Sequence, residues 1–563
     1  MRIFLYKKEK GDFMNNIKVI VQGKSIEVPR GITLETLSKE YQNELKYEVI
    51  IAKVNGRYKE LTETIQKECT IEFFDLLDRG ANRVFLNGLI YLCLYASNQL
   101  FGNNMTLKVN HSLDKGLYIE TSMEIEEEDL KQLEIKMQEI VKQDLPITKV
   151  TVSRTDAINY YKSVGDEVKA TLMNYVTSTH VSLYRLGNMY NYLYSEMPTS
   201  TKVLSHFELT YLHKHGFVLR FLTVYMKDGI KPYEHREKIY NLFQESRAWA
   251  KLLKLENVVD LNERVASSTV DELIRIDELT KNAKLLELAK NIVDKKDKVK
   301  IVLIAGPSST GKTTTTNKLV LCLKSLGMNP RMLSMDDFFV EREQTPFDSE
   351  GKLDFERLEA VDLNLFETTM KKLLNGEEVE MPTFNFVLGK KEYNSKMKLG
   401  SDDILLIEGI HALNPKVLEN IPKESKLRVY LSALTELNID NHVRISTTDN
   451  RLLRRIVRDN RTRGTSVEET LKRWVQVRRG EEMNIFPYQD DADLTYNTAP
   501  VYELGVLKTF VEPLLYSVPA DSPYYNEAVR LINFLGIFLP ISSESIPEDS
   551  ILREFIGGGC FKI

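Results

Sequence analysis

The stretch KIVLIAGPSSTGKTTTTNKL, at positions 300–319, constrains the fold of this chain more than any other feature. Five apolar residues lead into Gly306, and a polar loop then runs to Gly311, Lys312 and Thr313. This spacing matches G-x-x-x-x-G-K-[ST], a loop whose backbone N–H groups surround phosphate oxygens. Lys312 would neutralise the outer phosphates, and Thr313 would ligate Mg²⁺. The alternative, a strand-to-helix turn that binds nothing, is disfavoured because a buried strand precedes the motif and a helix follows it.

The C-terminal half continues this strand–loop–helix pattern. Strand-like and helix-like segments alternate from Val299 to about Val518, which predicts an α/β domain with a parallel sheet covered by helices. We expect the nucleotide phosphates to be bound by the whole loop and the first turn of its helix: Gly306, Pro307, Ser308, Ser309, Thr310, Gly311, Lys312, Thr313 and Thr314.

Carboxylates follow two later strands of this predicted sheet. NPRMLSMDDFF carries Asp336 and Asp337, and DDILLIEGIHALNP carries Glu408. The carboxyl ends of parallel strands meet at the ligand edge of a sheet, so Asp336 is placed to accept the proton of an attacking hydroxyl. Glu408, with Thr313 and Asp336, is predicted to hold Mg²⁺. Helix capping by the Asp pair is the alternative. No guanine-reading N-K-x-D follows, which argues against a GTPase.

An arginine-rich stretch, RISTTDNRLLRRIVRDNRTRG, comes next, and its apolar positions are spaced as on one helical face. A solvated basic helix and nucleic-acid binding are two readings of it. Arginine suits bidentate phosphate contacts, so the loop upstream favours a third, a lid that closes over the transferring phosphate. Its arginines are Arg444, Arg451, Arg454, Arg455, Arg458, Arg461 and Arg463.

Five motifs in order, GPSSTGKTT, SMDDFF, PTFNFVLGKK, LLIEGIHALN and RRIVRDNRTRG, resemble the uridine kinase/phosphoribulokinase family of P-loop kinases. The resemblance covers about residues 298–500. It implies that the protein uses ATP and Mg²⁺ to phosphorylate a primary hydroxyl of a nucleoside or sugar phosphate. Asp336 would be the general base, and Glu408 would be the carboxylate that binds Mg²⁺. Asp354 falls where such kinases hold the ribose hydroxyls. The lid positions fall on Arg455, Arg458 and Arg463.

The acceptor side departs from the family pattern. Phe384 stands where uridine kinases carry Tyr, Asn385 replaces Asp, and Phe339 replaces a further Tyr. Phe384 remains a candidate substrate-binding residue, but donors that would read a pyrimidine are missing. Phosphoryl transfer is therefore better supported than uridine as the acceptor.

The N-terminal half has a different character. Residues 17–76 alternate between apolar and polar positions and resemble a TGS domain, the β-grasp module of threonyl-tRNA synthetases. The α+β region that follows resembles the editing domain of those enzymes. At its metal-ligand positions stand Asn87, Tyr91, Leu193 and Met197. The resemblance therefore implies a retained fold without editing chemistry.

The predicted fold is thus multidomain. Its parts are a TGS-like β-grasp domain at 14–77, an editing-like α+β domain at 78–233, a helical connector at 234–297, a P-loop kinase at 298–520 and a C-terminal segment at 521–563 packed on the kinase. We expect an ATP- and Mg²⁺-dependent kinase acting on the 5′-hydroxyl of a nucleoside-like small molecule, with uridine or cytidine favoured. A kinase for a sugar phosphate-like acceptor and an ATP-switched RNA-binding regulator are the alternatives.

Composition bounds the partners. Four scattered cysteines form no CxxC pair, which fits a reducing cytoplasm, and the net charge of -5 does not favour tRNA binding. The longest apolar runs, such as residues 89–96, fall short of the ~20 residues that a membrane span needs. We expect ATP and a small-molecule substrate as partners, no membrane, and a homo-oligomer.

Overall fold

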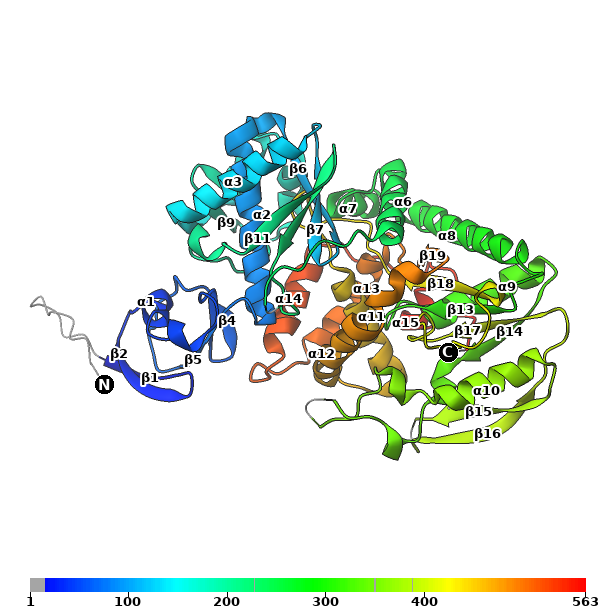
Figure 1. The fold of residues 1–563 in the computed structure, drawn as a ribbon. Coiled ribbons are helices and arrows are strands. Elements are labelled where there is room, and N and C mark those ends of the chain that lie inside the picture. Colours follow the sequence, from blue (N-terminus) through cyan, green and yellow to red (C-terminus); the bar gives the residue numbers. More distant parts are fainter. Residues whose placement is uncertain (1–15, 227, 349–350, 387, 563) are drawn as a thin grey trace, which may run out of the picture. The chain divides into compact units, whose positions relative to one another are not determined.

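The computed structural model describes residues 16–226, 228–348, 351–386 and 388–562. The chain divides into two compact units, residues 1–234 and 235–563 (Figure 1). Positions 14 and 15 of the first predicted domain lie outside the described residues. The helical segment predicted as a connector belongs to the second unit.

The first unit begins with a five-stranded sheet of order β2-β1-β5-β3-β4 and one short helix. Val19 and Val21 are buried between more exposed neighbours, because successive side chains of a strand point to opposite faces. Asn55 and Gly56 both have positive φ, 48° and 78°, and form the predicted hairpin turn. The elements are β1 (Asn16–Val21), β2 (Lys24–Pro29), α1 (Leu34–Ser38), β3 (Ile51–Val54), β4 (Arg57–Lys59) and β5 (Thr70–Phe74).

The rest of this unit is α+β, with a four-stranded sheet of order β11-β12-β7-β6 and a three-stranded sheet of order β10-β9-β8. Asp78 caps the long helix α2 by accepting the N–H groups of Gly80 and Ala81. The helices are α2 (Arg79–Phe101), α3 (Glu127–Gln143), α4 (Arg154–Ser163) and α5 (Glu167–Leu172). The strands are β6 (Leu107–Leu113), β7 (Gly116–Thr121), β8 (Ile147–Ser153), β9 (His180–Leu186), β10 (Met189–Asn191), β11 (Phe207–His213) and β12 (Gly216–Phe221).

Helix α2 is apolar because it forms the core of this region. Among the described residues, it alone is long and apolar enough, with its extension to Asn104, to cross a membrane by length and composition. In the structure, 67% of its apolar window is buried inside the protein.

The two segments aligned with the editing motifs lie together. The Asn87 amide donates to the Ser195 hydroxyl, and the Tyr91 hydroxyl donates to the carbonyl oxygens of Tyr184 and Met189, at 2.8 and 2.7 Å. Leu193 and Met197 are buried. Burial raises the pKa of Tyr91, so this residue stays a neutral hydrogen-bonding group.

The second unit opens with three helices, α6 (Glu237–Leu253), α7 (Val258–Ala266) and α8 (Val270–Val293). Buried polar contacts fasten them to the rest of the unit. Ser246 on α6 accepts from the Asn497 amide at 3.2 Å, and Glu278 on α8 accepts from the Tyr502 hydroxyl at 2.6 Å. These helices are therefore structural parts of the unit that carries the phosphate loop.

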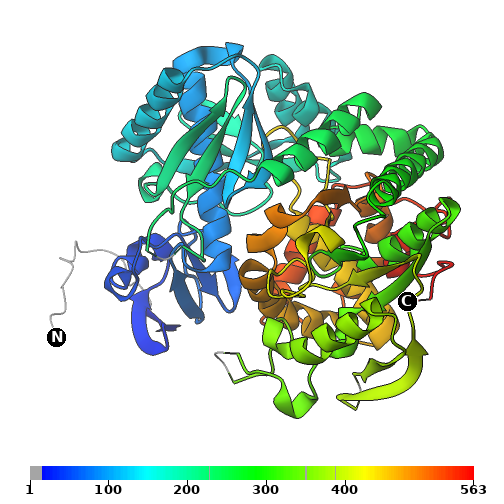
Figure 2. The same ribbon diagram turned by 45° about the vertical axis from the view of Figure 1, so that its right-hand side comes forward.

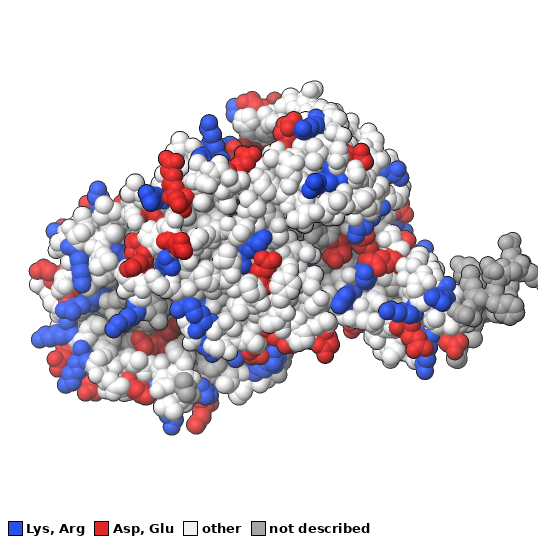
Figure 3. Space-filling view, turned by 180° about the vertical axis from the view of Figure 1, so that it is seen from behind, with Lys and Arg blue, Asp and Glu red and all other residues white. Residues whose placement is uncertain are grey.

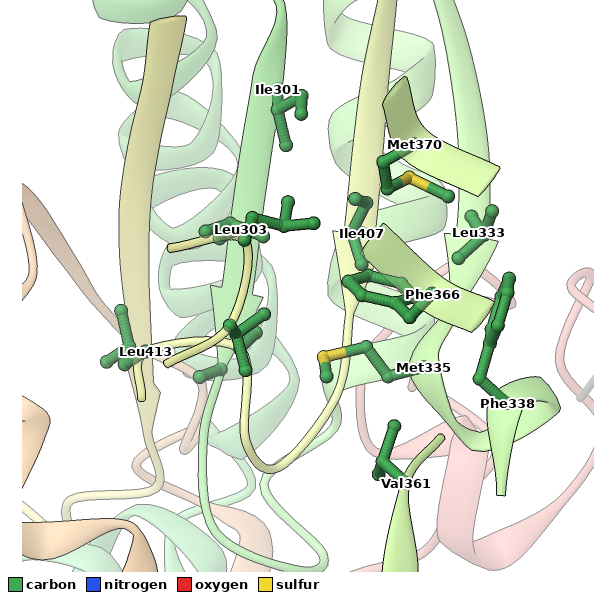
Figure 4. Packing of buried hydrophobic residues seen from close by; sticks show 14 of the residues in the cluster. Ile301, Leu303, Leu333, Met335, Phe338, Val361, Phe366, Met370, Ile407 and Leu413 are labelled. Atoms are coloured by element: carbon green, nitrogen blue, oxygen red, sulfur yellow. The ribbon is translucent and has the colours of Figure 1, made fainter. Parts of the chain in front are cut away.

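The main sheet of this unit is parallel throughout, in the order β14-β17-β13-β18-β19. Its strands read as apolar runs because both faces are covered, by α10 on one side and by α8 and α9 on the other (Figure 1). Figure 4 shows Ile301 and Leu303 of β13 and Ile407 of β17 packed with Phe366 and Met370 of α10. The strands are β13 (Ile301–Ala305), β14 (Asn329–Ser334), β17 (Asp403–Glu408), β18 (Lys426–Ser432) and β19 (Leu494–Asn497). This sheet confirms the predicted parallel α/β architecture.

A separate hairpin, β15 (Val379–Asn385) and β16 (Lys390–Met397), projects beside the main sheet (Figure 2, yellow-green). The remaining helices are α9 (Lys312–Ser325), α10 (Leu363–Leu374), α11 (Thr447–Arg463), α12 (Val467–Asn484), α13 (Glu503–Leu515), α14 (Tyr525–Leu535) and α15 (Arg553–Ile556).

Candidate active site

The loop between β13 and α9 makes a tight turn, in which two residues have positive φ. Gly311 has φ 82° and ends the loop, and Ser309 has φ 61°. A Cβ at Gly306 would lie 2.5 Å from the Leu431 carbonyl oxygen of the neighbouring strand, so only glycine fits there. The Thr310 hydroxyl donates to the Pro307 carbonyl at 2.8 Å and braces the turn.

Lys312, the first residue of α9, folds back over this loop. Its Nζ donates to the carbonyl oxygens of Gly306 and Pro307, at 3.0 and 3.3 Å. The ammonium group is thereby held above the loop, where it can meet the outer phosphates of a nucleotide. Thr313 follows it in the first turn of α9 and is partly buried.

The carboxyl ends of β14 and β17 place the three predicted acidic residues at one edge of the sheet. Asp337 is engaged structurally, since its Oδ1 accepts the Phe384 N–H at 3.3 Å. Asp336 keeps its side chain open to solvent, and its N–H donates to the Ser334 hydroxyl at 3.3 Å. That hydroxyl donates in turn to Glu408 Oε1 at 3.1 Å. The structure therefore favours Asp336 over Asp337 as the reactive carboxylate.

Electrostatics link these groups. Burial, together with the Asp336 charge, raises the pKa of Glu408 to about 7, against the lowering effect of Lys312. The protein around Asp336 partly desolvates its carboxylate and raises its pKa, although the side chain is not enclosed, and Lys312, Arg463 and Arg458 act to lower it. A divalent cation would offset the cost of ionising both carboxylates.

The donor set fits Mg²⁺. Asp336, Glu408 and Thr313 offer carboxylate and hydroxyl oxygens, the hard ligands that this ion prefers. No group of three or more His, Cys, Asp or Glu side chains over the described ranges is arranged to hold a metal. Mg²⁺ is commonly held by one or two carboxylates plus substrate phosphates, so a complete protein cage is not required.

Helix α11 carries most of the predicted arginines, and the structure sorts them. Arg451 and Arg454 are buried, not solvated, with side chains 2% and 0% exposed in ion pairs to Glu481 and Glu503. Both also support the loop from behind, because Arg451 donates to the Ser308 carbonyl at 3.1 Å and Arg454 to that of Ser309 at 3.4 Å. They fix the loop's shape by charge-assisted hydrogen bonds.

The three predicted lid arginines share one carboxylate. Asp459 lies 3.1 Å from Arg455, 2.9 Å from Arg458 and 3.4 Å from Arg463. Arg455 also donates to the Ser308 hydroxyl at 2.8 Å. Three guanidinium groups and one carboxylate give this cluster a net positive charge near the phosphate loop. The Arg455 and Arg458 side chains are 11% and 16% exposed, whereas that of Arg463 is 55% exposed. Burial lowers the pKa of Arg455.

On the acceptor side, the structure brings forward Glu356, which the sequence reasoning missed. Asp354, the predicted residue, uses its Oδ1 to accept the Glu356 N–H at 3.1 Å. Burial raises the pKa of Glu356 to about 7, with Arg455 and Lys312 lowering it and Asp336 raising it. The Glu356 carboxyl group therefore interacts electrostatically with the charges of the site, whereas Asp354 accepts a hydrogen bond within the turn.

Phe384 lies in an aromatic cluster beside this site. Its ring centroid is 5.8 Å from that of Phe339 and 5.0 Å from that of Phe386. The Phe355 ring also belongs to the cluster, with its centroid 6.1 Å from that of Phe339. Asn385 donates to Glu392 at 2.9 Å and accepts the Leu388 N–H at 3.1 Å, so its amide shapes the hairpin.

Comparison with known proteins agrees with this geometry. The signature of the Phosphoribulokinase / Uridine kinase family matches residues 301–504, and that of the TGS domain matches residues 18–75. Residues 301–504 are a phosphoribulokinase/uridine kinase family domain. This domain is therefore a nucleoside or small-molecule kinase, a phosphotransferase with an alcohol acceptor. The predicted resemblances to this family and to the TGS domain are confirmed.

Individual relatives cover parts of the chain. A uridine kinase of Staphylococcus haemolyticus is 28% identical over 177 residues, which are 31% of this chain and 76% of that enzyme. A threonine–tRNA ligase of Geobacillus is 29% identical over 186 residues, 32% of this chain, and the chain spans 29% of the ligase's length. A solved D-glycerate 3-kinase from Cryptococcus neoformans is 11% identical, with a TM-score of 0.28, over 38% of this chain and 93% of its own.

Proposed function

We propose that the kinase domain transfers the γ-phosphoryl group of ATP, with Mg²⁺, to the 5′-hydroxyl of a nucleoside such as uridine or cytidine. One observation carries this proposal. The phosphate loop with Lys312, the reactive Asp336 and the buried Glu408 stand at the same carboxyl edge of the parallel sheet. That edge is where ligands bind in such folds.

The chemistry would rest on position and charge. Asp336, open to solvent and next to Lys312, would accept the proton of the attacking hydroxyl. Lys312 and the cluster of Arg455, Arg458 and Arg463 would hold the charge that develops on the transferring group. Asp336, Glu408 and Thr313 would hold Mg²⁺, which supplies charge neutralisation on the phosphates.

Glu356 would orient the acceptor. Its carboxyl interacts electrostatically with Lys312, Asp336 and Arg455, so it would accept hydrogen bonds from hydroxyl groups held near the base. The neighbouring aromatic cluster of Phe339, Phe384 and Phe386 offers ring faces rather than donors. A flat base could stack on them without being read by hydrogen bonds.

A non-nucleoside acceptor is the second candidate. The observation that favours it concerns Asn385, whose side-chain amide makes hydrogen bonds within its own hairpin. These hydrogen bonds already occupy the amide that could otherwise recognise a base. A regulator that binds RNA has less support, because basic and acidic side chains are interspersed over the face seen in Figure 3.

A coupled ADP-release assay across nucleosides and sugar phosphates tests this proposal. We expect the highest kcat/KM with uridine or cytidine and dependence on Mg²⁺. Turnover only with sugar phosphates would show that the proposed acceptor is wrong and that the proposed kinase activity is right. ATP binding without turnover of any acceptor would support the regulator instead.

A further inference from the structure

The C-terminal segment, residues 549–557, lies against the phosphate-binding end of α9. Glu554 Oε2 accepts two hydrogen bonds from Thr314, from its N–H at 3.2 Å and from its hydroxyl at 2.8 Å. The N–H groups in the first turn of a helix have no partner within the helix. The Thr314 N–H is one of them, and in a phosphate loop these groups serve the nucleotide phosphates.

The rest of the segment is seated on the same loop. A Cβ at Gly311 would lie 2.5 Å from Ile551 Cγ2, so the Ile551 side chain rests directly on the last residue of the loop. The Phe555 ring is fully buried, with the Arg454 guanidinium 5.0 Å from its centroid. Arg461 on α11 donates to the carbonyl oxygens of Glu554 and Phe555, at 2.9 and 3.0 Å.

The contact also carries a cost that a purely structural packing would avoid. Glu554 is buried, 5% exposed, and brings a negative charge onto the loop that would have to accept the anionic phosphates. The segment is tied down a turn away as well, where Lys318 of α9 pairs with Asp549 at 2.9 Å. A carboxylate and a nucleotide phosphate cannot share one N–H donor, because both are anions and need the same position.

We propose that residues 549–557 form an autoinhibitory plug, in which the Glu554 carboxylate takes the place of a nucleotide phosphate on Thr314. The inference rests on the proposed function, since it assigns to ATP the site that the plug covers. ATP binding then requires the plug to leave, so the measured affinity equals the intrinsic affinity multiplied by the fraction of molecules in which the plug is out. The plug thus gives the kinase a built-in way to be switched on by whatever draws the C-terminal segment away.

Calorimetry with a non-hydrolysable ATP analogue and Mg²⁺ tests the plug in the full chain. The variants are Glu554→Ala and, as a matched control, Glu548→Ala, which removes an exposed carboxylate from the same end of the chain. A hydrogen bond to a charged group is worth about tenfold or more in an equilibrium constant. We therefore expect Glu554→Ala to bind the analogue about tenfold more tightly than the parent and Glu548→Ala to match the parent.

Equal or weaker binding by Glu554→Ala would overturn the plug while leaving the proposed function intact. Lack of binding by all three proteins would overturn the proposed function and the plug with it.

Hydrogen exchange of the parent protein decides the matter even if the variant folds poorly. The N–H groups of Glu554 and Phe555 donate to the carbonyls of Ile551 and Leu552, at 3.2 and 3.0 Å. Adding the analogue should speed exchange in a peptide that spans residues 551–557. Slower or unchanged exchange there, at a concentration that saturates calorimetric binding, would refute displacement.

Discussion

Replacing Arg454 by methionine tests whether the buried arginines of α11 hold the kinase domain together. The Arg454 and Glu503 side chains are 0% and 1% exposed, and Arg454 Nε lies 2.7 Å from the carboxylate. Without the guanidinium, Glu503 keeps a hydrogen bond from the Asn450 amide but loses its countercharge. Breaking a buried ion pair in this way costs about 3–5 kcal/mol of the free energy of unfolding.

Urea unfolding followed by tryptophan fluorescence measures this loss in the right part of the molecule. The chain has 2 tryptophans, and both, Trp249 and Trp474, lie in the second unit. The control is Arg473→Met, since Arg473 is 55% exposed and pairs with Glu469 one helical turn away. That surface pair should be worth at most about 0.5 kcal/mol.

The double variant Arg454→Met/Glu503→Leu separates charge from packing. It removes both charges and should regain most of the stability lost by Arg454→Met, because no unpaired charge stays buried. The reasoning is refuted if Arg454→Met costs no more than Arg473→Met, or if the double variant is as unstable as the single one.

Three further outcomes follow from the site and the first unit. Lys312→Ala should weaken ATP binding and turnover together, because the ammonium would contact phosphate in both ground and transition states; unchanged affinity by calorimetry would contradict this. The pKa of Glu356 is about 7, so its carboxyl ionises as pH rises. The KM of the acceptor should then fall about tenfold from about pH 6 to about pH 8, and Glu356→Gln should remove this dependence; a retained dependence assigns it elsewhere. Residues 1–234 should not release serine from seryl-tRNA for threonine, since Leu193 and Met197 offer no proton-transfer group; release above buffer would show that an editing site persists.

The phosphate loop could be predicted from sequence because its parts are consecutive. Gly306 and Gly311 set the turn, and Lys312 begins the next helix, so no distant residue is needed to recognise them. The alternation of strands and helices likewise predicts a parallel sheet, and the ends of such strands meet at one edge. Asp336 and Glu408 could therefore be assigned to the same edge from their positions in the sequence.

The arginine stretch shows where a local pattern stops being informative. Its helical spacing predicts α11, but Arg451 and Arg454 are buried only because of partners 30 and 49 residues further along, Glu481 and Glu503. A local charge pattern cannot separate a buried ion pair from a solvated charge. The alternative of a solvated basic helix does not hold for these two residues.

Irregular segments and contacts between residues far apart in the sequence could not be predicted. Asp354 and Glu356 are two residues apart in a stretch without regular structure, where periodicity cannot say which carboxylate faces the site. Glu554 meets Thr314 across 240 residues of sequence, and its motif-free neighbourhood gives no sign of that contact.

The kinetics of Asp336→Asn, beside the matched change Asp337→Asn, test the central claim most directly. Asp337 uses Oδ1 to accept the Phe384 N–H, and an asparagine can keep that hydrogen bond. Asp336→Asn should lower kcat by about 10²–10⁴. ATP affinity measured without Mg²⁺ should stay near that of the parent, because Lys312 and the loop backbone hold the phosphates. Asp337→Asn should keep a rate within about tenfold of the parent. Phosphoryl transfer at the parent rate by Asp336→Asn, or an equal loss in both variants, would contradict the assignment of Asp336 as the base.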